Sequence, residues 1–185
     1  MFENRNILLG VTGGVAAYKA VDLASKLTAA GARVQTVMTD DACQFVGPKS
    51  FEAVTAAAVH TSLWTPAEAH KSAHIALADW AHLIVVAPAT ANILGKAAQG
   101  ICDDLLSTTL CTTWAVPTLL APAMNTRMWE NPAVQRNVET LRQRGAQIVG
   151  PTAGRLACGT EGLGRMAEPS EILAALEALA ANLKS

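Results

Sequence analysis

The sequence contains no run of lysine or arginine residues, and its 14 basic and 15 acidic residues give a formal net charge of −1. Proteins that bind nucleic acid or an anionic membrane surface usually concentrate positive charge on one face or in one segment. The scattered charge here excludes that kind of partner. We therefore expect a small-molecule ligand, with no nucleic acid and no membrane involved.

Long apolar runs are also missing. The longest ones, such as residues 83–87, have the length of a strand and fall far short of the ~20 residues that a membrane-spanning helix needs. The segment 1–5 lacks the charged and apolar regions of a secretory signal peptide. These absences predict a cytoplasmic protein.

The chain lacks a C-x-x-C pair, and no cluster of histidines at metal-binding spacing accompanies its four cysteines. Disulfides and zinc sites normally require such patterns, so we expect reduced thiols and no metal. At most one or two of the cysteines should take part in chemistry. The four cysteines are Cys43, Cys102, Cys111 and Cys158.

The 185 residues are 51% hydrophobic and 16% charged, which is enough for one well-filled core and short for two. We therefore expect one domain over residues 1–185. Strand-like and helix-like segments alternate along it, and this rhythm is typical of an α/β fold. The predicted fold class is a single Rossmann-like, flavodoxin-like, doubly wound parallel sheet with helices on both faces.

The predicted strands are short apolar or β-branched runs, and the predicted helices fill the intervals between them. The strands are expected at 6–11, 33–38, 83–87, 118–121 and 147–149, and the helices at 15–24, 91–98, 104–113, 131–143 and 170–183. The segments 48–72 and 151–169 fit neither pattern. Long irregular segments in a compact domain are usually functional loops.

A polar amide follows one of the predicted strands. The run 118–121 breaks at Pro122, and Asn125 comes just before a helix-forming segment. Ligands of open α/β sheets bind at the carboxyl ends of the strands, so Asn125 is a candidate for function. The alternative is that Asn125 merely caps the following helix.

Two glycines, Gly13 and Gly14, follow the first strand and precede a helix. They permit close approach of the backbone to an anion, and the helix offers unpaired N–H groups to a phosphate. The alternative is a tight turn without a ligand. The segment is neither a P-loop nor a full G-x-G-x-x-G motif, so it is only a weak signal taken alone.

The end of the second strand favours a mononucleotide over a dinucleotide. A dinucleotide-binding domain usually places an acidic residue there for the ribose, whereas this strand ends at Thr39, whose hydroxyl suits a phosphate oxygen. Asp40 and Asp41 come directly afterwards, so the distinction is not decisive. The same three residues also fit an N-cap that opens a helix.

The loop after the third predicted strand, residues 88–92, consists of small and hydroxylic residues. A flat ring system can lie against such a loop, with Thr90 and Asn92 as hydrogen-bond partners for its heteroatoms. A simple N-cap at Thr90 explains the pattern equally well.

Two further residues are candidates for proton transfer. His74 precedes the third predicted strand, and its titration near neutral pH suits a base, although a lone histidine is more often structural. Cys158 lies in the segment 156–166, where three glycines within six residues predict a mobile flap. The alternative is a glycine-rich connector in which the cysteine is incidental.

Taken together, these motifs resemble the homo-oligomeric flavin-containing cysteine decarboxylases over essentially all 185 residues. The glycine turn alone is unspecific, whereas Pro-x-Met-Asn-x-x-Met-Trp combined with His74 and the Cys158 flap is highly specific. Two positions depart from the pattern: His82 stands where an aspartate is common, and Cys102 where a small alanine is common. The matching motifs are at 12–19, 74–81, 87–92, 122–129 and 158–166.

The resemblance implies FMN as cofactor and assigns roles to individual residues. The implied catalytic residues are His74 as base, Asn125 as the group that holds the substrate carboxylate, and Cys158 as proton donor on a clamp near 151–168. The implied substrate-binding residues are Met124, Asn125, Arg165 and Met166. The implied cofactor-binding residues are Gly13, Gly14, Val15, Thr39, Ser50, Phe51, Pro88, Ala89, Thr90, Ala91 and Ala123.

The implied activity is a carboxy-lyase reaction, the FMN-dependent decarboxylation of 4'-phospho-N-pantothenoyl-L-cysteine to 4'-phosphopantetheine in coenzyme A biosynthesis. The resemblance also implies a homotrimer or homododecamer, and a phosphopantothenate–cysteine ligase domain fused beyond residue 185. The alternatives are a peptidyl-cysteine decarboxylase, a flavin prenyltransferase of the same fold, and a non-enzymatic regulatory subunit.

Overall fold

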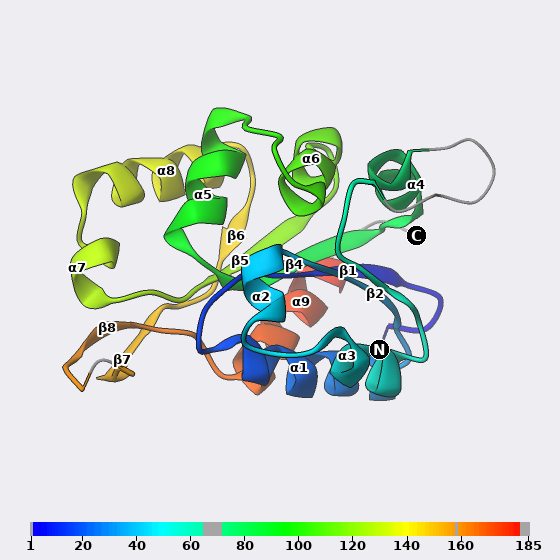
Figure 1. Cartoon of the computed structure of the whole chain (residues 1–185), viewed down its shortest axis with the longest axis horizontal. Helices are drawn as coiled ribbons and strands as arrows, with labels where there is room; N and C mark the ends of the chain where they lie inside the picture. The colour runs from blue at the N-terminus through cyan, green and yellow to red at the C-terminus, as the bar shows by residue number, and fades with distance from the viewer. Residues whose placement is uncertain (1, 65–71, 158, 182–185) are drawn as a thin grey trace.

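The computed structural model describes residues 2–64, 72–157 and 159–181. Six parallel strands form one sheet in the order β3-β2-β1-β4-β5-β6, with helices on both sides (Figure 1). The predicted doubly wound parallel sheet is therefore confirmed. The strands are β1 (Asn6–Val11), β2 (Arg33–Met38), β3 (Val59–His60), β4 (Leu83–Ala89), β5 (Thr118–Pro122) and β6 (Gln147–Ile148).

The two central strands, β1 and β4, are buried along their whole length. Their continuous apolar sequences suit this position, because a central parallel strand is covered by helices on both faces. Gly10 of β1 pairs with Val86 of β4, and a Cβ at Gly10 would lie 2.7 Å from the Leu106 side chain. The absence of a side chain at this position lets a helix pack directly on the sheet.

Each face of the sheet has its own apolar core. On one face, α1 (Ala17–Ala29), α3 (Pro48–Thr55) and α9 (Pro169–Ala181) cover the strands. The helices on the other face are α4 (Ala73–Trp80), α5 (Ala91–Gln99), α6 (Leu105–Thr112) and α8 (Pro132–Gln143). Two single-turn helices, α2 (Asp40–Cys43) and α7 (Thr126–Trp129), follow β2 and β5. They lie at the carboxyl ends of their strands.

The segment 48–72 was expected to be irregular, and this expectation is wrong for its first part. It contains α3 and the edge strand β3, and α4 begins directly after it. Helix α3 starts with Pro48 at its first position, where proline is well suited because its missing N–H has no intrahelical partner anyway. β3 has only two residues, too few for a recognisable pattern.

The expectation of an irregular segment is also wrong for 151–169. Strands β7 (Thr152–Arg155) and β8 (Glu161–Arg165) form an antiparallel hairpin there, and α9 begins at Pro169. The four glycines of this segment lower its strand propensity. Its conformation is decided by tertiary contacts with the loop after β5, which a local pattern does not reveal.

Candidate active site

A cavity of about 520 Å³ lies where the strand order of the sheet reverses, between β1 and β4. Open α/β sheets bind ligands at this switch point, beyond the carboxyl ends of the strands, and the volume suits a cofactor-sized molecule. The loops after β1, β2 and β4 all contribute to the wall. Of the residues predicted to contact a ligand, Gly13, Thr39, Thr90 and Asn92 line it.

The buried residue Thr12 holds the loops after β1 and β4 together. Its Oγ1 donates a hydrogen bond to the carbonyl oxygen of Pro88 at 2.7 Å and accepts one from the N–H of Thr90 at 3.1 Å. Both capacities of the hydroxyl are therefore used within the protein. This pair of bonds fixes the spacing of the two loops before any ligand arrives.

Gly13 and Gly14 differ in what surrounds them. A Cβ at Gly13 would overlap Asp41, whereas a Cβ at Gly14 would find its nearest neighbour, the Thr90 methyl group, at 3.8 Å. Only Gly13 is thus required by close packing of the β1 loop against α2. The helix that follows has Ala16 at its N-cap and no side-chain cap, so no side chain competes for the N–H groups of its first turn.

Thr39 and Thr90 both cap helices, as the alternative to a ligand-binding role predicts. Thr39 Oγ1 accepts from Ala42 N at 3.2 Å, and Thr90 Oγ1 accepts from Ile93 N at 3.5 Å. Capping uses each hydroxyl as an acceptor only. A cap of this kind is compatible with donation of the hydroxyl proton to a ligand in the cavity.

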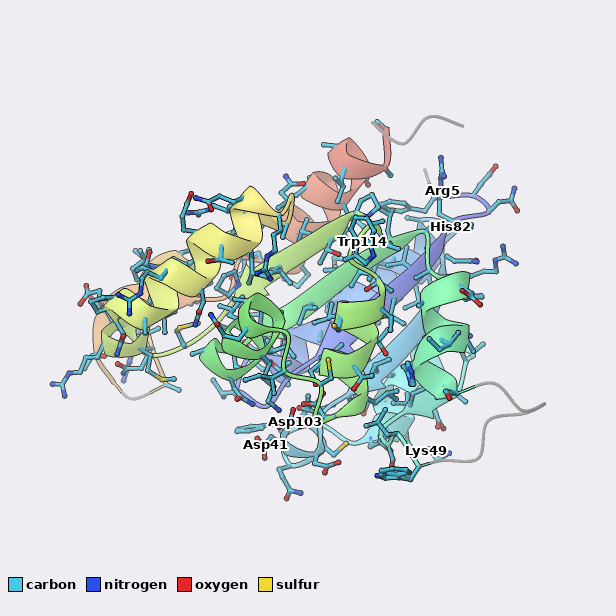
Figure 2. All side chains as sticks on the ribbon, turned by 90° about the horizontal axis from the view of Figure 1, so that it is seen from above. Arg5, Asp41, Lys49, His82, Asp103 and Trp114 are labelled. Carbon is cyan, nitrogen blue, oxygen red and sulfur yellow. The ribbon has the colours of Figure 1, made fainter. Side chains whose placement is uncertain are left out.

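An ion-pair cluster forms another part of the wall. Lys96 Nζ lies 2.7 Å from both Asp103 Oδ1 and Asp104 Oδ2. Partial burial of Lys96 opposes its charge, but the two carboxylates outweigh this effect and raise its pKa. The hydrogen bond from Lys96 in turn lowers the pKa of Asp103. Figure 2 shows Asp103 close to Asp41, at the carboxyl edge of the sheet.

This cluster was not predicted from the sequence, because its members belong to different segments and carry no motif. The loop after β3 was not predicted either, since β3 itself was not predicted. The lining residues that were not predicted to contact a ligand are Thr12, Met38, Asp40, Asp41, Thr61, Ser62, Leu63, Trp64, Ile93, Lys96, Asp103, Asp104, Leu105 and Met128.

Asn125 is the N-cap of α7, and its Oδ1 accepts a hydrogen bond from Arg127 N at 2.9 Å. The capping alternative is therefore confirmed, and it does not conflict with a role in binding. The preceding residue, Met124, donates its N–H to the carbonyl oxygen of Gly164 in β8 at 2.9 Å. The hairpin is thus attached directly to the Asn125 loop.

The hairpin is also attached to α1. Lys19 Nζ lies 2.8 Å from Glu168 Oε1, and Arg165 pairs with the same carboxylate. Lys19 and then Arg165 lower the pKa of Glu168. Met166, predicted to bind substrate, is only 1% exposed and packs in the core. Its side chain supports the base of the hairpin.

Several predicted residues lie away from the cavity within this chain. His74 is half-buried on α4, which is at the opposite end of the sheet from α7 (Figure 1). Ser50 is exposed on α3, while Phe51 beside it is fully buried in the core. Cys158 lies outside the described residues. The other predicted cofactor residues outside the cavity wall are Val15, which is exposed, and Gly14, Pro88, Ala89, Ala91 and Ala123, which are buried or half-buried.

Among the described residues, no group of three or more histidine, cysteine, aspartate or glutamate side chains could hold a metal ion. No helix in the same part of the chain is long and apolar enough to span a bilayer.

The doubly wound sheet, the switch-point cavity and the glycine turn define a mononucleotide-binding α/β domain. The family model described as Flavoprotein matches residues 1–181, and the chain belongs to that family.

Three comparisons are informative about relatives. The chain is 50% identical over 173 residues to the coenzyme A biosynthesis bifunctional protein CoaBC of Bacillus subtilis, covering 94% of this chain and 42% of that protein. It therefore spans less than half of that relative. A solved PPC decarboxylase, a cysteine-to-serine variant complexed with pantothenoylaminoethenethiol, is 34% identical with a TM-score of 0.85, covering 96% of this chain and 99% of that chain. The FMN-dependent cysteine decarboxylase SpaF is 36% identical with a TM-score of 0.80, covering 95% and 99%.

Proposed function

We propose that this domain catalyses the FMN-dependent decarboxylation of 4'-phospho-N-pantothenoyl-L-cysteine (PPC) to 4'-phosphopantetheine. The observation that carries the proposal is the cavity at the switch point, bounded by the Gly13 turn and by the loops that carry Thr39 and Thr90. The similarity to CoaBC and to PPC decarboxylase supports the choice of substrate. We place the reaction in the cytoplasm, within residues 1–185.

The residues of the cavity fit FMN. Its volume of about 520 Å³ lies in the range of cofactor sites. The uncapped first turn of α1, the Gly13–Gly14 turn and the Thr39 hydroxyl would hold the phosphate. The exposed carboxylates of Asp40 and Asp41 also border the cavity, and they disfavour an anion beside them. A phosphate is therefore expected on the glycine side.

The loop after β4 would hold the remainder of the cofactor. Thr90 lines the cavity with its hydroxyl, and Ala91 and Ala123 are small and half-buried, whereas Pro88 and Ala89 are buried at the end of β4. Of Ser50 and Phe51, only Ser50 is exposed, so only its side chain could contact the cofactor. When bound, FMN supplies a two-electron oxidant for the carbon that bears the thiol.

The chemistry explains why an oxidant is needed. A cysteine carboxylate loses CO2 poorly, because the carbanion that remains has no electron sink. Oxidation of the thiol-bearing carbon gives a thioaldehyde β to the carboxylate, as the ketone is in a β-keto acid. CO2 can then leave with formation of an enethiolate. Return of the hydride to carbon, with one proton to the neighbouring carbon and one to sulfur, yields 4'-phosphopantetheine, so the complete cycle needs no external reductant.

Three side chains of this protein would handle protons and orientation. The His74 imidazole accepts the substrate thiol proton, and the Asn125 amide carries the kind of N–H donors that bind a carboxylate. Cys158 Sγ donates the proton for the final reduction. The relative solved as a cysteine-to-serine variant holds an enethiol, which supports a role for a cysteine after CO2 has left. The hairpin would exclude water while the enethiolate persists.

The position of His74 argues for a shared active site. Helix α4 and the Asn125 loop lie at opposite ends of the sheet, and His74 does not line the cavity of its own chain. A neighbouring copy would bring its His74 to that cavity in a homotrimer, or in a dodecamer built of trimers. A phosphopantothenate–cysteine ligase, fused or separate, would supply the substrate.

The decisive experiment is incubation of the flavin-loaded protein with PPC, followed by mass analysis of the products. The expected product has lost CO2 and carries no other change, and no NADH or NADPH is added. An S-methylated PPC is the matched control, because it has no thiol proton to lose, and it should remain intact. Unchanged PPC in the presence of bound flavin would refute the proposal.

A second candidate activity is the decarboxylation of a peptide that ends in cysteine, because the similar protein SpaF is an FMN-dependent cysteine decarboxylase. Such an enzyme can stop at the enethiol, so its product would be two hydrogen atoms poorer than a fully reduced one. Parallel assays with a cysteine-terminated peptide distinguish the two substrates. A flavin prenyltransferase would alter the flavin itself, and a regulatory subunit would leave both substrates unchanged.

A further inference from the structure

The hairpin formed by β7 and β8 lies beside α7 and outside the six-stranded sheet (Figure 1). One of its faces meets the Asn125 loop, where Met124 N donates to the carbonyl oxygen of Gly164 at 2.9 Å. The next residue, Arg165, projects from the opposite face, because side chains alternate between the two faces of a strand. The position of the hairpin therefore depends both on the Asn125 loop and on the groups that bind Arg165.

Glu168 binds Arg165 and also reaches α1. Its Oε1 lies 2.8 Å from Lys19 Nζ and accepts a hydrogen bond from Arg165 Nη2. The Arg165 guanidinium extends across the hairpin to β7, where a Cβ at Gly154 would lie 3.4 Å from Arg165 Nη1. One carboxylate thus connects α1 with both strands of the hairpin.

The backbone of Glu168 is anchored on both sides. Its N–H donates to Glu171 Oε2 at 2.7 Å, and its carbonyl oxygen accepts from the N–H groups of Glu171 and Ile172 in α9. The two preceding residues, Met166 and Ala167, are buried in the core. The carboxylate therefore projects from a fixed point, and the hairpin is the part that can move relative to it.

The environment of Lys19 makes the charge of Glu168 important. The Lys19 side chain is only 12% exposed, whereas those of Glu168 and Arg165 are 43% and 45% exposed. Exposed ion pairs contribute little, but a largely buried cation that loses its counter-charge is destabilising. Lys19 and then Arg165 lower the pKa of Glu168, so its carboxylate is charged at neutral pH. Loss of that charge would release Arg165 and leave Lys19 without this partner.

We propose, on the basis of the function proposed above, that Glu168 is a positioning residue: by holding Arg165, it keeps the hairpin against the Asn125 loop while the enethiolate is in the site. A shielded enethiolate is reduced to 4'-phosphopantetheine. One that is released early leaves as an enethiol with two hydrogen atoms fewer, and the two electrons taken from the substrate remain on the flavin. Glu168 therefore decides which product leaves, and not how fast CO2 is lost.

The first test measures the position of the hairpin without any substrate. Glu168→Gln keeps the size of the side chain and removes its charge. In the flavin-loaded variant the Met124 amide, which donates to Gly164, should exchange its hydrogen several-fold faster, while the amides of β1 keep their wild-type rates. An unchanged Met124 amide, or equal acceleration of the β1 amides, would overturn the proposal.

Glu161→Gln is the matched control for this test. It makes the same chemical change within the hairpin, at an exposed glutamate that has no ion pair among the described residues. Exchange of the Met124 amide should keep its wild-type rate in this variant. Acceleration as large as in Glu168→Gln would mean that any loss of negative charge loosens the hairpin, and it would overturn the assignment to Glu168.

A double-mutant comparison tests the route through Arg165. Arg165→Met removes the guanidinium and should accelerate exchange of the Met124 amide about as much as Glu168→Gln does. The double variant should be no faster than either single variant, because both substitutions break the same link. Accelerations that multiply in the double variant would show that Glu168 acts by another route and would overturn the proposal.

The last test follows the products of a single turnover of PPC in the absence of oxygen. Glu168→Gln should release CO2 at close to the wild-type rate and yield several-fold more enethiol, with an equal amount of flavin left without yellow absorbance. Glu161→Gln should match the wild type. Equal losses of CO2 and 4'-phosphopantetheine, without enethiol, would indicate a merely structural role and overturn the proposal. Intact PPC with the wild-type protein would refute the proposed function instead, and hydrogen exchange would still decide whether Glu168 positions the hairpin.

Discussion

The N–H of Met124 donates to the carbonyl oxygen of Gly164 at 2.9 Å, which joins the Asn125 loop to the hairpin. A Cβ at Gly164 would overlap the Met124 carbonyl oxygen, and one at Gly162 would overlap the Thr126 hydroxyl. The glycines of β8 are therefore required by close contact. Their presence in the sequence reflects docking of the hairpin at least as much as flexibility.

Gly164→Ala should detach the hairpin from the Asn125 loop. Overlap with backbone atoms cannot be relieved by rotation of a side chain, and overpacking of this kind typically costs about 1–3 kcal/mol. We expect a lower urea midpoint and a lower kcat/KM for PPC. Gly47→Ala is the control, because Gly47 has φ −70° and no atom within 4 Å of the added Cβ. Equal urea midpoints for Gly164→Ala and Gly47→Ala would show that the hairpin is not packed closely against the Asn125 loop.

The hairpin illustrates what the sequence could not reveal. The glycine-rich segment was interpreted as an irregular flap, because the partner that fixes its conformation lies about 40 residues earlier in the chain. Local propensity predicts strands poorly when tertiary contacts decide them. By contrast, β1 and β4 were predicted well because they are nearly continuous apolar runs, and β2 because its β-branched residues lie between Gly31 and the Thr39–Asp41 cap.

Gly13→Ala and Gly14→Ala should differ, although the two glycines are neighbours. The first variant places a Cβ against Asp41, whereas the second meets only the Thr90 methyl group at 3.8 Å. We expect Gly13→Ala to lower the free energy of unfolding of the flavin-free protein by about 1–3 kcal/mol, which lowers its Tm by several degrees. The variant should also lose its flavin on gel filtration. Gly14→Ala should keep the wild-type Tm. A similar Tm for both variants would contradict the close packing of the β1 loop on α2.

The residues of the candidate site that directly follow strands could be predicted from the sequence. Gly13, Thr39 and Thr90 were identified because each follows a strand, and parallel strands place their carboxyl ends on one edge. The Lys96 cluster with Asp103 and Asp104 was not, because a helix and a loop bring these side chains together without any sequence spacing that signals it. The loop after β3 was missed because a two-residue strand has no period.

Unfolding should become easier as the pH falls below neutrality, partly through His60. Burial lowers the pKa of His60, so the folded protein binds this proton less tightly than the unfolded chain, whose value is about 6.5. The resulting stability is complete above the unfolded value and is lost as the pH falls through the folded one. Glu168 and Asp103, with lowered pKa values, lose their contributions only at more acidic pH.

Urea unfolding of the wild type and His60→Gln between pH about 7.5 and 5.5 checks this expectation. Glutamine cannot take up a proton, so the urea midpoint of the variant should change less with pH in this window. At lower pH, the midpoints of the variant and the wild type should fall with the same slope. Parallel profiles across the whole range would mean that His60 is not a source of the acid sensitivity.

Subunit complementation should reveal whether active sites are shared. His74→Asn removes the proposed base, and we expect it to bind flavin without turnover. Asn125→Asp keeps a good helix cap at α7 but opposes the substrate carboxylate with a second negative charge. Each variant alone should be inactive and retain the wild-type Tm.

Mixed trimers that contain both variants should regain activity, because one neighbour's His74 can serve another chain's Asn125. In a cyclic trimer with two chains of one kind and one of the other, a single interface of the three combines both intact residues, which predicts about one third of wild-type turnover. Doubly tagged trimers purified after co-expression allow the measurement. If one chain instead supplied both residues to the same site, no mixture could contain an intact site, and activity would stay at the level of the separate variants.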